Sequence, residues 1–184
     1  TDEGYLDQQK SKPWTGHYIS HFADEMTLRG IREASSRIVF DSFVPAVLVA
    51  LALGERIGIL TWPCSAVPLL ARRIAGEGLA DRVVRIEGID SEKTPELKDV
   101  LQAVQNMEKD DIQCLIIGRG FLTDGSAEEY RMAERLEAAL GGEMPVVDAN
   151  RAGMRWLELN AHMNYFHSRR TYFVPPEKGD ETEG

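Results

Sequence analysis

The chain alternates short apolar segments with longer amphipathic ones, and this alternation constrains its fold more than any other feature. The clearest apolar segments are residues 56–61 (RIGILT) and 112–117 (IQCLII), whose length is typical of buried strands. Strands that alternate with longer helices indicate βαβ crossovers, and strands that are apolar throughout indicate a sheet covered on both faces. We therefore predict an α/β fold with three αβα layers around a mainly parallel sheet.

The other elements follow from the same periodicity and from the turn residues that delimit it. Strands are expected at 18–22, 37–40, 82–86 and 145–147, and helices at 25–35, 44–53, 65–76, from 94 onward, at 126–140 and at 149–166. We divide the chain into an N-terminal arm (1–16), one α/β domain (17–166) and a C-terminal tail (167–184), in which the basic segment HSRR at 167–170 is expected to be a solvated helix end.

Composition argues against several classes of partner. The formal net charge of −9 disfavours nucleic acid, whose phosphates require basic patches. The sequence contains no apolar run of the ~18 residues that span a bilayer, and its polar start lacks the apolar core of a signal peptide. The two cysteines, Cys64 and Cys114, are too few for a disulfide framework. We expect a cytoplasmic protein without nucleic-acid or membrane partners.

Motifs for common cofactors are absent from the sequence. It contains no P-loop, no GxGxxG and no GxSxG. His162 and His167 are five residues apart, a spacing that does not stack on one helix face, and no other metal spacing is present. We therefore predict neither a cofactor nor a metal.

Polar residues follow three of the expected strands, where a parallel sheet binds its ligands. These positions are His21-Phe22, Thr61 to Cys64, and Gly118-Arg119-Gly120. From pattern alone the chain remains a doubly wound α/β domain, and an unrelated flavodoxin-like domain is an open alternative.

Three stretches carry a resemblance to a known family. The first is LALGERIGILT followed by SAVPLLARRIAGEGLADRVVRIEGID, and the second is DDIQCLIIGRGFLTDGSAEEYRMAERLEAALGGEMPVVDANRAG. The third, HFADEMT, is shorter. Together they cover roughly residues 17–163, and they resemble the aspartate/glutamate/hydantoin racemase superfamily.

This resemblance implies two similar α/β lobes with the active site between them, and it places the second lobe at about residues 42–148. Members of the superfamily work without a cofactor. One cysteine from each lobe exchanges a proton with opposite sides of the substrate's α-carbon, while backbone N–H groups and small hydroxyls bind the carboxylate. The resemblance therefore implies a small carboxylate as ligand.

The sequence departs from the superfamily at both cysteines. The first aligns with His21 and the second with Arg119, and several dozen residues of the first lobe have no counterpart before His21. Arginine stays protonated, so it cannot serve as the second acid–base group. A first lobe this short would leave a sheet edge uncovered, so we expect a homo-oligomer, most simply a two-fold dimer.

Each candidate residue has a functional and a structural interpretation. As catalytic groups we select His21 or Cys64 for the base and Arg119 for the anion. The structural alternatives are a satisfied histidine, a turn residue and a surface arginine. As substrate-binding residues we select Thr61, Ser65, Gly118, Gly120, Asp24 and Asp41. For Asp24 and Asp41, helix capping is the competing role.

Two functions from different classes remain open. The chain is either a divergent cofactor-independent isomerase, lyase or decarboxylase that acts next to the carboxylate of a small acid, or a catalytically inactive relative that binds a carboxylate metabolite or a protein partner. Convergence of His21, Thr61 and Arg119 on one pocket would favour the enzyme.

Overall fold

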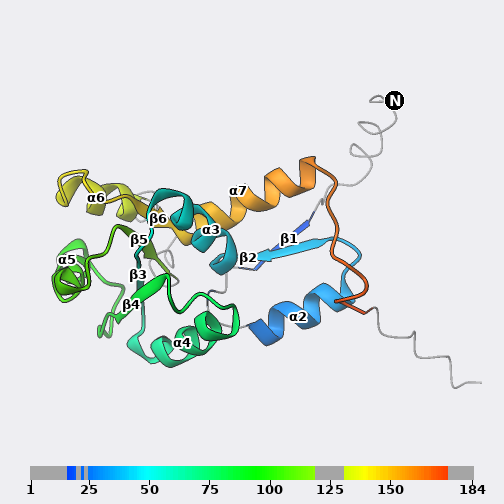
Figure 1. Ribbon diagram of the computed structural model, residues 1–184, viewed down its shortest axis with the longest axis horizontal. Helices are drawn as coiled ribbons and strands as arrows, with labels where there is room; N and C mark the ends of the chain where they lie inside the picture. Colours follow the sequence, from blue (N-terminus) through cyan, green and yellow to red (C-terminus); the bar gives the residue numbers. More distant parts are fainter. Residues whose placement is uncertain (1–15, 20–21, 23–24, 119–130, 174–184) are drawn as a thin grey trace, which may run out of the picture.

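A four-stranded parallel sheet forms the centre of the protein, with strands in the order β4-β3-β5-β6. The computed structural model describes residues 16–19, 22, 25–118 and 131–173 (Figure 1). The strands of this sheet are β3 (Ile57–Thr61), β4 (Val83–Gly88), β5 (Cys114–Ile117) and β6 (Val146–Asp148). The predicted parallel α/β sheet is confirmed.

Helices cover both faces of this sheet, as its apolar strands require. Successive side chains of a strand point to opposite faces, so Ile59 packs with the helices α3 (Phe43–Leu53) and α4 (Val67–Gly76). Leu60 packs on the other face with the helices α5 (Leu97–Gln105) and α6 (Met132–Ala139). The two buried clusters give the three αβα layers that the sequence predicts.

A second, two-stranded sheet lies beside the first, made of the parallel strands β1 (Gly16–Ile19) and β2 (Ile38–Asp41). Helix α2 (Glu25–Ala34) packs on β2, and α7 (Ala149–His162) runs from the end of β6 to cover both strands (Figure 1). This helix lies so close to the small sheet that a Cβ atom on Gly153 would be 2.6 Å from the ring of Tyr18.

The boundaries of two elements differ from the expected ones. The first strand is Gly16–Ile19 rather than 18–22, because pairing of Gly16 with Ile38 sets its register on β2. The helix expected at 65–76 is divided into the 3₁₀ turn η1 (Cys64–Ala66) and α4. Pro68 at the start of α4 suits a first turn, where no N–H is needed.

Two helices also begin or end elsewhere. The helix expected from Thr94 begins at Leu97, where Glu96 and Asp99 form a reciprocal capping box, and the 3₁₀ turn η2 (Glu108–Asp110) follows it. The last helix stops at His162 rather than 166, since Asn164 takes a left-handed conformation with φ of 57°. The start of the helix expected at 126–140 lies outside the described residues.

The basic segment at 167–170 is not a solvated helix end. It follows α7 and lies against the small sheet, where the Nε2 atom of His167 accepts a hydrogen bond from the Val39 N–H at 2.7 Å. Partial burial of the imidazole and its ring contacts hold this segment in place.

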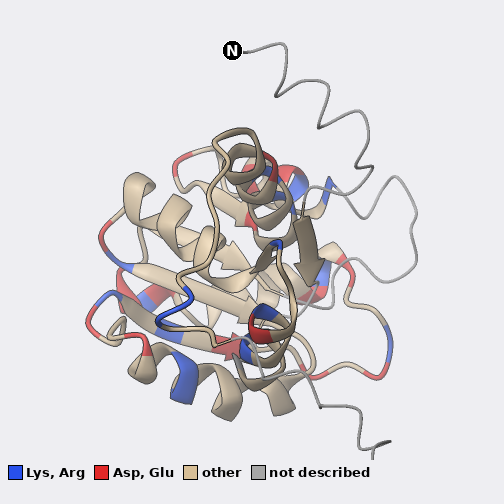
Figure 2. Ribbon diagram, turned by 90° about the vertical axis from the view of Figure 1, so that its right-hand side faces the viewer, with Lys and Arg blue, Asp and Glu red and all other residues tan. Residues whose placement is uncertain are grey.

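Charged residues of both signs are interspersed along the described chain rather than separated onto opposite faces (Figure 2). Several form exposed ion pairs, such as Arg151 with Glu134 at 3.1 Å. Among the described helices, none combines the length and the apolar character that crossing a membrane requires.

Candidate functional site

Thr61 and Gly118 lie side by side at the carboxyl edge of the central sheet. Leu60 pairs with Ile117 in the β3–β5 register, and the Gly118 N–H continues the pairing with a 2.7 Å bond to the Leu60 carbonyl. Alternation along the strands places Thr61 and Gly118 on the face that also carries Ile59. Thr61 is only 1% exposed.

Phe22 connects the segment after β1 to this edge. Its side chain is buried, and its ring packs edge-on against Phe43 with centroids 5.2 Å apart. A Cβ atom on Gly118 would lie 3.0 Å from the Phe22 ring and 3.0 Å from the Leu60 carbonyl oxygen. Glycine at 118 therefore permits a contact between the segment after β1 and the end of β5.

Cys64 and Ser65 lie on the β4 side of Thr61, and both are exposed. A Cβ atom on Gly88, the last residue of β4, would lie 2.6 Å from the Cys64 Cα atom. Strand β3 separates β4 from β5, so two strand spacings, about 10 Å, separate the ends of β4 and β5. Cys64 is therefore farther from Gly118 than Thr61 is.

Cys114 has the structural role that its sequence position indicates. It is fully buried within β5, and burial raises the pKa of its thiol to about 11. A buried thiol of this kind is chemically inert at neutral pH.

Asp41 forms a buried ion pair rather than a helix cap. Its Oδ2 atom lies 2.5 Å from Nη1 of Arg73, a residue of α4, and both side chains are almost fully buried. Ser42, not Asp41, occupies the position before α3, without a side-chain cap bond. Arg73 also donates a 3.0 Å hydrogen bond to the Phe22 carbonyl and lies 4.3 Å over the Phe43 ring.

Sequence reasoning missed Arg73, although one signal was available. It follows Leu70 by three residues and precedes Ile74, so it lies on the apolar face of its helix, whereas Arg72 is exposed.

Tyr18 was also missed as a site residue. Its hydroxyl donates a 2.6 Å hydrogen bond to Asn150 Oδ1 and connects β1 to the first turn of α7. Burial raises the pKa of this phenol far above its ordinary value, so the hydroxyl stays protonated and acts as a donor.

Four predicted site residues, His21, Asp24, Arg119 and Gly120, lie outside the described residues. Of the remaining candidates, the structure brings Thr61 next to Gly118, places Cys64 and Ser65 near the end of β4, and pairs Asp41 with Arg73. Within the part of the chain that is described, no three histidine, cysteine or acidic side chains gather as metal ligands.

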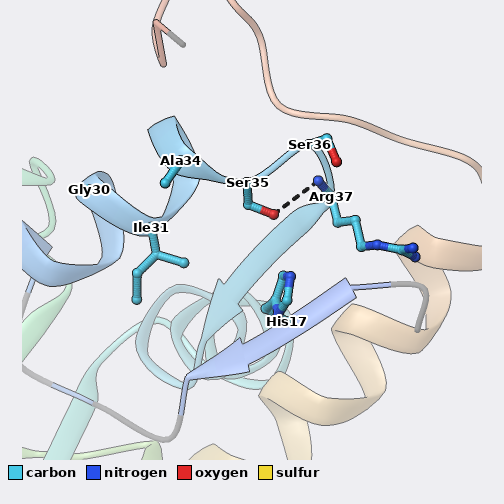
Figure 3. Close-up of a pocket in the computed structure, with 7 residues that line it drawn as sticks. All are labelled: His17, Gly30, Ile31, Ala34, Ser35, Ser36 and Arg37. Carbon is cyan, nitrogen blue, oxygen red and sulfur yellow. Dashed lines mark hydrogen bonds between the residues drawn. The ribbon is translucent and has the colours of Figure 1, made fainter. Parts of the chain in front are cut away.

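A cavity of about 410 Å³ lies on the small sheet, at the end opposite to the carboxyl edge (Figure 3). His17, Ser36 and Arg37 are among its lining residues, with Ile31 and Ala34 as apolar neighbours. Helix α2 ends here, and its negative carboxyl end disfavours an anion. The Arg37 side chain also points away from Ile31 and Ala34 (Figure 3), so nothing in this cavity favours the binding of an anion.

The sequence matches no family model. A relative, an uncharacterised protein of Schizosaccharomyces pombe (strain 972), is 28% identical over an alignment of 165 residues that covers 83% of this chain. The chain spans 65% of the length of that relative.

Several solved structures have a similar fold. The allantoin racemase from Klebsiella pneumoniae has a TM-score of 0.75 at 19% identity, over 95% of this chain and 72% of its own. The allantoin racemase from Pseudomonas fluorescens has a TM-score of 0.72 at 20% identity, over 96% and 75%. An arylmalonate decarboxylase has a TM-score of 0.58 at 19% identity, over 86% and 75%.

Proposed function

We propose, from the premise that this chain has the fold of the aspartate/glutamate/hydantoin racemase superfamily, that it catalyses cofactor-independent proton transfer next to the carboxylate of a small acid. The observation that supports this most is the contact between Phe22 and Gly118. His21 and Arg119 are the immediate chain neighbours of these two residues, and adjacent Cα atoms are about 3.8 Å apart.

In this proposal Arg119 holds the substrate carboxylate through paired N–H donors. Thr61, at the end of the neighbouring strand, supplies a hydroxyl to the same anion. Gly118 permits the close approach of backbone that such binding requires.

His21 is the proposed base. An imidazole titrates near neutrality and can accept the α-proton. The electron pair left on the α-carbon then delocalises into the carboxylate as an enediolate, which the Arg119 guanidinium stabilises by charge. We favour His21 over Cys64 because Cys64 packs on Gly88 at the end of β4, with β3 between it and β5.

This mechanism has one acid–base group, since arginine keeps its proton. The proton that replaces the lost one would come from the same imidazole or from water. A lyase, a decarboxylase or a one-base isomerase fits such a site better than a two-base racemase.

The second candidate is a non-catalytic relative that binds a small carboxylate or a protein partner. In the alignment that the resemblance implies, both cysteine positions are occupied by other residues, and the structure pairs the buried Asp41 with Arg73.

The two candidates are separated by following α-proton exchange in deuterated water by NMR. The compounds are aspartate, glutamate, a hydantoin, allantoin and an arylmalonate, the last also assayed for release of carbon dioxide. We expect exchange or decarboxylation with at least one compound, which His21→Asn abolishes and His162→Asn, a control on the exposed end of α7, leaves unchanged.

A binding-only relative would give a different result. No compound would react, yet small dicarboxylates would raise the melting temperature of the wild type and not that of Arg119→Ala. Fast exchange that survives His21→Asn would exclude our assignment of the base.

We further propose that the protein forms a homodimer. Strand β1 has no strand partner on the side away from β2 among the described residues, and such an edge tends to be covered. A monomer mass by light scattering at micromolar concentration would rule this out.

A further inference from the structure

The outer edge of β2 is covered by side chains instead of by a strand. Of the described strands, only β1 pairs with β2. On the opposite side, the Val39 N–H donates to Nε2 of His167 at 2.7 Å, and the Val39 carbonyl accepts from Nε of Arg32 at 3.1 Å. These two side chains take the places that the backbone of another strand would occupy.

The segment that carries His167 runs from the end of α7 to α2 (Figure 1), and further contacts hold it there. Tyr172 accepts a 3.0 Å hydrogen bond from Nη1 of Arg32 and packs on the His167 ring with centroids 5.3 Å apart. The imidazole also lies edge-on to Phe40, at 5.8 Å. Arg169 donates to the Arg32 and Ser35 carbonyls at the end of α2.

The bond between Val39 and His167 requires a neutral imidazole. A backbone N–H can only donate, so Nε2 must carry a lone pair and the ring proton must be on Nδ1. A second proton on the ring would turn Nε2 into a donor and leave two N–H groups facing each other.

The positive charges around His167 also favour the neutral form of its imidazole. Among the described groups, Arg32 of α2 and Arg169 of its own segment face it with positive charge, and the ring of Tyr172 packs against it. Burial, followed by the charge of Arg32, lowers the pKa of His167 from its ordinary value of 6.5.

We propose that residues 167–173 form a proton-sensitive clasp on β2: it is closed when His167 is neutral, and protonation of His167 opens it and releases the Val39 N–H. This inference is independent of the proposed function, because it concerns the edge of the small sheet and not the carboxyl edge of the central one.

The direction of the pH dependence follows from the lowered pKa. Between the pKa of the closed state and 6.5, the open state binds more protons than the closed state. The clasp is therefore at full strength above pH 6.5 and weakens as the pH falls below 6.5. It weakens no further once the pH is below the pKa that His167 has in the closed state.

Amide hydrogen exchange of the full chain tests this clasp. The protection factor of Val39, corrected for intrinsic exchange, is measured between pH 8 and pH 5. We expect it to fall by up to about tenfold per pH unit within the window. In His167→Gln, an amide oxygen can still accept the Val39 N–H but does not titrate, so the protection should not change with pH. His162→Gln, which removes an exposed imidazole on α7, should behave like the wild type.

A constant Val39 protection factor in the wild type would overturn the proposal, as would an unchanged pH dependence in His167→Gln. If His167→Gln fails to fold, NMR titration of the wild type decides instead. The Val39 amide shift must then follow the His167 ring titration, and independent titration of the two would also overturn the clasp.

Discussion

Nη1 of Arg73, in helix α4, lies 2.5 Å from Oδ2 of Asp41, at the end of β2, and the two side chains are 2% and 1% exposed. This pair joins the central sheet's helical layer to the small sheet. Asp41→Asn should lower the free energy of unfolding by about 3–5 kcal/mol, because among the described residues it leaves the buried guanidinium only its longer ion pair, with the partly exposed Glu77 at 4.0 Å. Urea denaturation measures the change.

A double-mutant cycle provides the control for the ion pair. Replacing both partners by apolar residues, Asp41→Leu with Arg73→Met, should destabilise less than the sum of the two single changes. Glu134→Gln, which breaks the exposed pair with Arg151, should leave the free energy of unfolding nearly unchanged. Additive effects at Asp41 and Arg73 would show that the pair is not coupled.

Gly118→Ala should destabilise the protein and disturb the candidate site together. The new methyl group would lie 3.0 Å from the Phe22 ring, and such overpacking costs about 1–3 kcal/mol. Gly30→Ala is the matched control: nothing lies within 4 Å of its Cβ position in α2, so the change should stabilise by about 0.5–1 kcal/mol. A neutral effect at Gly118 would mean that Phe22 moves freely away.

The two cysteines should react with an alkylating reagent at very different rates in the folded protein. Cys64 is exposed, whereas Cys114 is buried and its thiol pKa is raised to about 11 by burial. At pH 8 we expect one modified thiol by mass spectrometry, and none in Cys64→Ser, until denaturant is added. Rapid modification of both thiols in the native state would contradict the burial of β5.

Asp148 should give a pH-dependent contribution to stability. Burial raises the pKa of this carboxyl above its ordinary 3.8, so the folded state binds the proton more tightly than the unfolded state. The folded state therefore loses stability as the pH rises from 3.8 to the raised pKa. Asp148→Asn should therefore gain stability relative to the wild type as the pH rises from 3.8, with no further gain above the raised pKa.

The control for Asp148 is its role as the helix cap of α7. Its Oδ1 atom accepts a 2.9 Å bond from the Arg151 N–H, which an asparagine oxygen can also accept. Asp148→Ala should be less stable than Asp148→Asn by about 1 kcal/mol at every pH, because neither variant titrates and only alanine lacks the cap. If Asp148→Asn lowers the free energy of unfolding as much as Asp148→Ala does, the charge of Asp148 and not its cap bond determines its contribution to stability.

The central sheet could be predicted from sequence because its two inner strands, Ile57–Thr61 and Cys114–Ile117, are buried along their whole length and almost entirely apolar. Phe22 misled the first strand assignment, because an apolar residue after a strand is indistinguishable from one within it. Its burial depends on Gly118, which is 96 positions away in the sequence. Local patterns carry no information on such a contact.

Long-range partners also explain what was missed in the site. Asp41 is a plausible ligand-binding residue until Arg73 is found beside it, and His167 is an ordinary basic residue until its ring meets Val39. The carboxyl-edge position of Thr61 beside Gly118 follows from strand order in a parallel sheet and was therefore predictable. Whether His21 and Arg119 join them remains a prediction.

The route of α7 sets the order in which the molecule can assemble during synthesis. The small sheet uses β1 and β2 from the early part of the chain, while the helix that covers both strands begins at Ala149. The ribosome synthesises the central strands before this helix, so the small sheet stays uncovered while the central sheet folds. Nascent chains stalled before Ala149 should therefore expose Tyr18 and recruit chaperones, even though the central strands are already complete.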